Sequence, residues 1–223
     1  MAAAQVIRPG LVLLAVLAGI AAVWPPAVSA QSPDTTSAEV RVGDWWTYDR
    51  KDEITGLPVD TFTSAVTEIS AATIATKLAY RDTHRTGMVV FDHDWNRTRN
   101  GQRTYKPNDG HGIRLPLTVG NEWRTEFEER NAQSSTSMKG VSLSKVAAQE
   151  MLTTPAGTFE TFRIERQVKQ GNVADPSRAT ESQFVLWFAP QINHWVRRTE
   201  LTKVQTHMLE NTSDELTAFG RKQ

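Results

Sequence analysis

Apolar and polar residues alternate along most of the chain with a period of two. Ile74, Leu78 and Tyr80 share one parity, and mostly polar residues occupy the other. Successive side chains of an extended strand point to opposite faces, so this alternation predicts a half-buried β-strand. Similar runs recur at residues 45–50, 59–68, 87–91, 123–130, 141–152, 159–168, 182–188 and 194–204. The pattern predicts an antiparallel all-β protein of roughly nine or ten strands.

Turn-forming residues separate these runs. They occur at residues 55–58, 100–101, 108–110, 171–172 and 175–176. A further turn is predicted at residues 153–158, where Pro155 presets φ for the first corner and Gly157 can take a left-handed conformation. A phosphate-binding loop would need more glycines and a helix directly after them. The alternating run that follows predicts a hairpin instead.

A short motif occurs twice. Gly43 is followed directly by Asp44, and Trp46 comes two residues after Asp44. Gly120, Asn121 and Trp123 have the same spacing. A glycine at positive φ, a turn-forming residue and a tryptophan that enters a strand together suit the start of a strand. The repetition suggests two related halves of the fold, and coincidence is the alternative.

Little helix is expected. Residues 212–219 fit either a short C-terminal helix or a last strand. Charged side chains lie inside several predicted strands, which indicates that one face of the sheet is in contact with water. We therefore predict a single β-rich domain over residues 40–223. It is expected to be an open, curved antiparallel sheet or half-barrel, and the repeated motif suggests that it has two related halves. A sandwich remains the alternative architecture.

The first thirty residues have the composition of an export signal. Arg8 precedes an apolar run at residues 11–23, and Val28-Ser29-Ala30 fits the small-residue rule for signal peptidase. The run is shorter than the roughly twenty residues of a membrane span. We expect residues 1–30 to be a cleaved signal peptide and residues 31–39 a flexible leader, with an uncleaved anchor as the alternative. The mature protein should then be periplasmic or secreted, without a transmembrane anchor.

Composition and charge exclude some functions. The chain has no cysteine, so it has neither a lipobox nor a thiolate zinc site nor a cysteine nucleophile. Its 25 basic residues balance its 25 acidic ones, and no nucleic-acid partner is expected. The densest basic stretch contains Arg97, Arg99, Arg103 and Lys106. We interpret it as a solvated loop, although the neighbouring aromatic residues could also stack on a base.

Several of these motifs occur together in one known group of proteins. A strand that ends in the sequence 154–159 is followed by a strand that ends in Trp187-Phe188-Ala189-Pro190. Over residues 40–204 the chain resembles exported bacterial proteins of unknown function of the DUF3108-like families, where a tyrosine usually replaces Phe188. The resemblance implies an exported antiparallel β fold, such as the half-barrel of lipoprotein carriers. It brings no catalytic residue with it.

Asp92, His93 and Asp94 are the best candidates for chemistry. Three potential metal ligands stand together, but an extended chain would point His93 away from the two carboxylates. A metal-dependent exported hydrolase that uses these residues is therefore the alternative hypothesis, and a loop cap with solvated carboxylates is the simpler interpretation. We predict no catalytic residue, no metal site and no cofactor.

Aromatic residues are the stronger indication of function. The mature chain has six tryptophans. Neighbours such as Trp45 and Trp46 point to opposite faces of one strand, which suggests that one face of the sheet covers a core and the other a covered groove. The hypothesis is an exported, non-catalytic envelope protein that binds a lipid, another apolar ligand or an envelope protein partner in the concave face of the sheet. The residues predicted to line that face or to pack in the core are Trp46, Phe62, Trp123, Phe162, Phe184, Trp187 and Trp195.

Overall fold

The computed structural model describes residues 37–175 and 179–222. The strands are β1 (Asp44–Asp52), β2 (Pro58–Ile69), β3 (Ile74–Tyr80), β4 (Thr86–Phe91), β5 (Arg97–Asn100), β6 (Arg103–Lys106), β7 (Glu122–Asn131), β8 (Thr136–Thr154), β9 (Gly157–Asn172), β10 (Thr180–Ala189), β11 (His194–Val204) and β12 (His207–Arg221). A 3-10 turn, η2 (Pro190–Ile192), lies between β10 and β11. The predicted signal peptide, residues 1–30, and residues 31–36 of the predicted leader lie outside the described residues.

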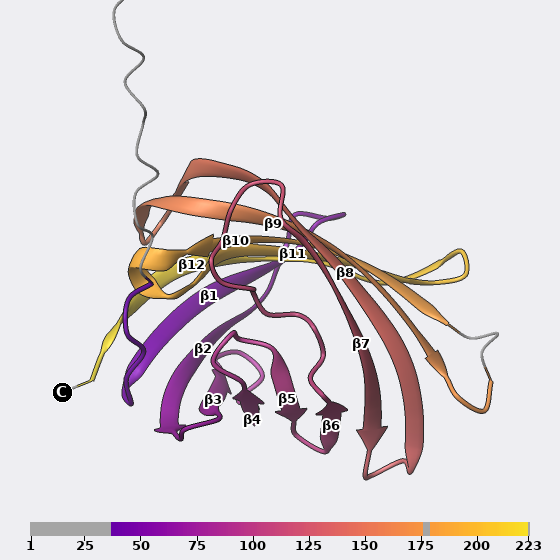
Figure 1. The fold of residues 1–223 in the computed structure, drawn as a ribbon. Helices are drawn as coiled ribbons and strands as arrows, with labels where there is room; N and C mark the ends of the chain where they lie inside the picture. Colours follow the sequence, from indigo (N-terminus) through magenta and orange to yellow (C-terminus); the bar gives the residue numbers. More distant parts are fainter. Residues whose placement is uncertain (1–36, 176–178, 223) are drawn as a thin grey trace, which may run out of the picture. The chain divides into compact units, whose positions relative to one another are not determined.

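Each strand pairs antiparallel with the next one along the chain, and β12 returns to pair with β1. The strands therefore form a closed barrel, in which the long strands β7 to β12 arch over the shorter β3 to β6 (Figure 1). The predicted antiparallel all-β class is confirmed. The sheet is not left as an open half-barrel, however, because the first and last strands share hydrogen bonds and remove both sheet edges.

The predicted strands are all present, and three further strands complete the barrel. β5 and β6 occupy the stretch that was interpreted as a solvated loop, so that interpretation is wrong. The C-terminal segment is strand β12, which rules out the helical alternative for residues 212–219. Residues 171–172 end β9 rather than forming a turn. These differences share a cause, since short or charged strands lack the apolar alternation that identifies a strand in sequence.

A positive φ occurs, as predicted, at Gly43, Gly120 and Gly157. Gly157 has φ +135° and follows the two-residue turn of the β8–β9 hairpin. Gly43 and Gly120 have the same φ of +93°. Each donates its amide to a valine carbonyl of the next strand, at 2.9 Å to Val66 and 2.8 Å to Val146. The two copies of the motif thus start β1 and β7 with the same local geometry.

The described end of the predicted flexible leader is attached to the barrel. The Ala38 amide donates to the Pro190 carbonyl at 2.8 Å, and the Asn193 side chain donates to the Ala38 carbonyl at 2.7 Å. Ala38 is therefore held beside η2 by one backbone hydrogen bond and one from a side chain.

An aromatic cluster fills one part of the barrel. Trp46 stacks on His194 with 4.0 Å between ring centroids, and Trp95 meets Trp46 edge-on at 5.7 Å. The Tyr48 hydroxyl lies 2.6 Å from Nδ1 of His194. These side chains are all buried, so the barrel is a packed core in this region and not an open channel.

The loop between β6 and β7, residues 107–121, enters the barrel. The Ile113 amide donates to the Asp94 carbonyl at 2.7 Å, and the Ser142 hydroxyl donates to the Gly110 carbonyl at 2.9 Å. Figure 1 shows this loop crossing from β6 to the start of β7. The loop therefore brings its polar side chains to the inner faces of strands that lie far from it in sequence.

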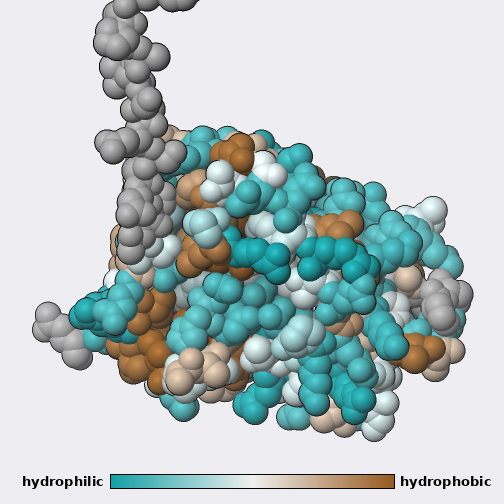
Figure 2. Space-filling view, viewed as in Figure 1, coloured by the Kyte–Doolittle hydropathy of each residue, from teal (hydrophilic) through white to brown (hydrophobic). Residues whose placement is uncertain are grey.

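The outer surface is mainly polar. On the face seen in Figure 2, hydrophobic residues form small separate groups among hydrophilic ones. Within residues 37–175 and 179–222, no helix has the length and apolar character needed to span a membrane.

Candidate functional site

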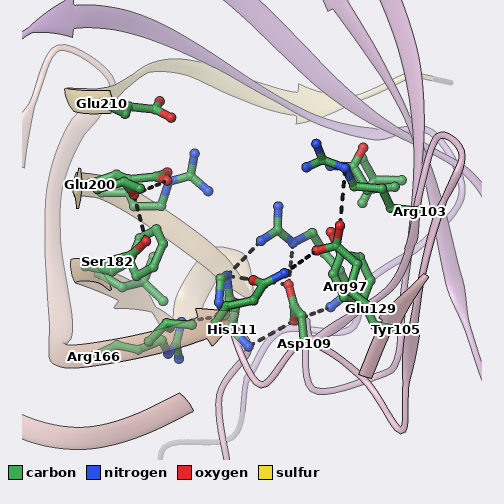
Figure 3. Close-up of a pocket in the computed structure, with 18 of the residues that line it drawn as sticks. Arg97, Arg103, Tyr105, Asp109, His111, Glu129, Arg166, Ser182, Glu200 and Glu210 are labelled. Atoms are coloured by element: carbon green, nitrogen blue, oxygen red, sulfur yellow. Dashed lines mark hydrogen bonds and ion pairs between the residues drawn. The ribbon is translucent and has the colours of Figure 1, made fainter. Parts of the chain in front are cut away.

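The barrel encloses a cavity of about 620 Å³, next to the aromatic cluster. Two lining residues, Arg103 and Leu209, are strongly exposed, at 55% for the arginine side chain and 62% for the leucine, so the cavity opens to solvent beside them. Its volume falls in the range of roughly 300–1,000 Å³ that is typical of small-molecule sites. The inward-facing residues of nearly all strands contribute to its wall (Figure 3).

One side of the cavity is apolar. β2, β3 and β4 are adjacent strands, and their inward positions supply Phe62, Leu78, Tyr80, Val89 and Phe91. Alternation explains this wall, because the outward partners on the same strands are mostly polar or small. An apolar portion of a ligand could displace water from this surface.

Charged residues line much of the remaining wall. Five arginines line the cavity together with four carboxylates: Arg50, Arg97, Arg103, Arg166 and Arg198, with Asp109, Glu129, Glu200 and Glu210. The cavity is therefore amphipathic, and an entirely apolar ligand would leave charged groups without water or a partner.

Asp109, from the β6–β7 loop, is the centre of one charged group. Arg97 forms a short ion pair with its carboxylate and also donates from Nη2 to Nδ1 of His111 at 2.7 Å. Because arginine can only donate, Nδ1 of His111 is the acceptor, and the neutral imidazole carries its proton on Nε2. Burial, with nearby arginines and against the charge of Asp109, lowers the pKa of His111 to about 3. Burial alone would raise the pKa of the Asp109 carboxyl, but the Arg97 charge and the hydrogen bonds from Arg97 and from the His111 amide hold it below its usual value.

Arg166 connects the loop to the sheet. Its Nε donates to the Ser144 hydroxyl at 2.8 Å, and its two terminal nitrogens donate to the carbonyl oxygens of His111 and Gly112. No carboxylate lies within ion-pair distance of Arg166 among the residues that the structure describes. Burial and the charges of Arg97 and Arg198, against the opposing charge of Asp109, lower its pKa to about 10, so it is still charged at neutral pH.

Asp214 holds a second charged group. Its carboxylate accepts from Arg50 Nε at 2.6 Å and from Arg198 Nη2 at 2.8 Å, and its side chain is only 2% exposed. Two guanidinium groups thus share one carboxylate. Arg198 and Arg50 lower the pKa of Asp214 although burial opposes this.

Two donors of this region have no partner among the described residues. They are Nε2 of His111 and Nε of Arg198, and both atoms are buried. Buried polar atoms are usually hydrogen-bonded, so each unpaired donor needs an explanation, such as an ordered water or a ligand.

The structure divides the predicted aromatic residues into groups. Phe62, Phe184 and Trp195 line the cavity. Trp46, Trp123 and Phe162 are buried in the aromatic and apolar core instead. Trp187 projects from the opposite face of β10, where its Nε1 donates to Glu150 at 2.7 Å and the Arg197 guanidinium lies 5.5 Å from its ring centroid.

Asp92, His93 and Asp94 do not converge. The Asp92 carboxylate accepts from the amides of Asp94 and Asn96 and from the Asn108 side chain, which makes it a cap for its own loop. Nε2 of His93 instead lies 3.0 Å from the Ser70 carbonyl oxygen. Among residues 37–175 and 179–222, no three histidine, cysteine, aspartate or glutamate side chains are arranged to hold a metal ion.

The charged residues of the cavity were not identified from the sequence. Arg166 has the same parity as Phe162, Ile164 and Val168, so its inward direction was readable from the alternation on β9. The contribution of Asp109 and His111 was not readable, because nothing in the sequence shows that the loop turns into the barrel.

Two outer grooves of about 660 and 650 Å³ lie over β7 to β10. Outward side chains such as Lys139, Glu181 and Lys145 border them, and these are solvated surface groups. The inner cavity is the stronger candidate, since it combines buried charge with an apolar wall.

No protein-family model matches this sequence, and no curated protein matches it either. The similarity to the DUF3108-like families therefore stays a prediction.

Two known crystal structures share the fold. A protein described as a candidate lipoprotein from Parabacteroides distasonis has a TM-score of 0.52 at 10% identity, with 81% of this chain and 96% of that chain covered. A candidate exported protein with a YmcC-like fold from Bacteroides fragilis has a TM-score of 0.52 at 11% identity, with 83% and 99% covered. The chain thus has the fold of these barrels.

Proposed function

We propose that this protein is an exported, non-catalytic protein of the cell envelope that binds a ligand with an apolar portion inside its barrel. The observation that carries the proposal is the open cavity of about 620 Å³ with an apolar wall from three adjacent strands. A cavity of this size that served only for packing would cost stability, because its lining side chains lose contact partners.

Export is supported by two independent features. The N-terminal sequence has the pattern of a signal peptide. The proteins with a similar fold are described as exported or as lipoproteins. We place the mature protein in the periplasm or the secreted fraction, and a DUF3108-like relationship agrees with that location.

The proposal can be tested with a long-chain alcohol as a neutral ligand. Trp95 and Trp195 line the cavity, so binding should change the intrinsic fluorescence. A Leu78→Trp substitution would fill the apolar wall, and we expect it to weaken binding at least tenfold because the added indole occupies the space of the ligand.

Lys77→Trp is the matched control. Lys77 is exposed on the outer face of the same strand, one residue from Leu78. We expect this variant to bind like the original protein. Equal loss in both variants, or no binding of any amphiphile to the original protein, would contradict a ligand site in the barrel and would favour a protein partner on the surface.

A further inference from the structure

We propose that the ligand carries an anionic head group, a carboxylate or a phosphate, which binds beside Arg97, Arg198 and His111 inside the cavity. This inference rests on the proposed function and adds the chemical class of the ligand. The site is the charged group shown in Figure 3, together with Arg198 from β11.

The balance of close charges favours an anion. Four guanidinium groups, those of Arg50, Arg97, Arg166 and Arg198, line this part of the cavity. Three carboxylates form ion pairs with them: Asp109, Asp214 and, at 3.9 Å from Arg50, Glu210. Glu129 and Glu200 also line the cavity, beyond ion-pair distance of these four arginines. Among the described residues Arg166 has no carboxylate partner and Arg198 shares Asp214 with Arg50, so a negative group beside these two guanidinium groups would be attracted.

Two of these arginines contact His111 directly, since Arg97 donates to its Nδ1 at 2.7 Å and Arg166 donates to its carbonyl oxygen. Burial has the largest effect on the pKa of His111 and lowers it; the charges of Arg97, Arg166 and Arg198 lower it further, against that of Asp109. His111 thus presents a neutral imidazole to the surrounding guanidinium groups. It acts as a hydrogen-bond donor here and not as another cation.

Unused donors provide the second argument. Nε2 of His111 and Nε of Arg198 are buried without a partner. Arg198 makes one hydrogen bond, to Asp214, so most of its five N–H groups are free, within the part of the chain that the structure describes. Carboxylate and phosphate oxygens fit the planar guanidinium group and form strong, charge-assisted hydrogen bonds with it.

The position of the apolar wall selects an amphiphile over a small anion. Arg50 belongs to both parts of the cavity, because its guanidinium lies 5.3 Å from the ring centroid of Phe62 on the apolar wall. A chain attached to the anionic head can therefore lie along β2 to β4 while the head stays at the arginines.

Four ligands separate the possibilities: a long-chain fatty acid, the alcohol of the same chain length, a short-chain carboxylate, and inorganic phosphate. We expect the fatty acid to bind at least tenfold more tightly than the alcohol at neutral pH, since its carboxylate forms charge-assisted hydrogen bonds with the guanidinium groups and the hydroxyl does not. The short acid and phosphate should bind at least a hundredfold more weakly than the fatty acid.

Arg198→Gln should abolish the preference of the protein for the acid and leave the affinity for the alcohol unchanged. Arg99→Gln is the control, because Arg99 is exposed and is not among the residues that line the cavity. It should keep the preference. Circular dichroism checks the fold of both variants, and the comparison of acid with alcohol in the original protein remains decisive if Arg198→Gln does not fold.

Each outcome has a definite meaning. Equal affinity for acid and alcohol would overturn the anionic head group and leave the apolar cavity function intact. Absence of binding by both long-chain ligands would overturn the proposed function itself. Binding of phosphate as tightly as the fatty acid would overturn the amphiphile and indicate a site for a free anion.

Discussion

Asp214 shows how a single buried carboxylate supports the interior. It pairs with both Arg50 and Arg198, which come from β1 and β11, the two neighbours of its own strand. Isolated buried charges are unfavourable, so each arginine depends on this partner. The residue therefore joins three strands where the barrel closes.

Asp214→Asn should destabilise the protein by about 3–5 kcal/mol, because two partly buried guanidinium groups lose the carboxylate that they share, and Arg50 keeps only the longer contact with Glu210 at 3.9 Å. Chemical denaturation measures the change in the free energy of unfolding. Glu181→Gln is the control: its pair with Lys169 is exposed on both sides, and no measurable change is expected. Equal effects in the two variants would show that the Asp214 ion pairs do not stabilise the fold.

At the scale of elements, the β6–β7 loop is the feature that creates the site. It carries Asp109 and His111 into the barrel, and Arg166 holds it there through backbone carbonyls. A tight contact with the turn after β4 fixes its path. An ideal Cβ on Gly112 would lie 2.1 Å from the Asp94 carbonyl oxygen and 2.4 Å from the Asn96 amide nitrogen.

Gly112→Ala should therefore destabilise the protein by about 2–4 kcal/mol, since backbone atoms on both sides would have to move. It should also weaken ligand binding, because the loop would leave its place. Gly87→Ala in β4 is the control, with no heavy atom within 4 Å of the added carbon. A normal stability and affinity in Gly112→Ala would contradict the close packing of the loop.

Sequence reasoning identified regular elements better than irregular ones. A long strand such as β11 was predicted with the bounds that the structure has. β5 and β6 have only four residues each and contain arginines, so their pattern resembled a loop. Their role depends on neighbours in the barrel, which supply the ion pairs that allow a charged strand to face inward.

The site was predictable only in part for a similar reason. Phe62 and Phe184 were selected because apolar parity indicates an inward direction. Whether an inward aromatic residue meets a cavity or another side chain depends on packing, as Phe162 shows by its place in the core. The charged wall was missed because charged residues within strands were assigned to a solvated face.

At the scale of the whole molecule, buried histidines make stability depend on pH. His111 and His194 both have a lowered pKa in the folded protein, mainly through burial. In the unfolded chain a histidine has a pKa of about 6.5. The unfolded state therefore takes up protons below pH 6.5 while the folded state does not, so stability is complete above that pH and falls as the pH decreases.

Between pH 6.5 and 5 we expect a loss of about 1.4 kcal/mol per pH unit for each buried histidine. Urea denaturation at several pH values measures this slope. His111→Gln should reduce it by the contribution of one proton, whereas His207→Gln, at an exposed position, should leave it unchanged. A slope near zero in the original protein would mean that the buried histidines take up protons without unfolding.

The closed barrel as a whole is interpreted as a chamber for an amphipathic ligand. Native mass spectrometry of the mature protein, purified after export by a bacterial host, tests this claim most directly. We predict an additional mass that disappears on denaturation and belongs to a molecule with an apolar chain and an acidic group. A bare polypeptide mass, together with no binding of added long-chain acids or alcohols, would contradict the account.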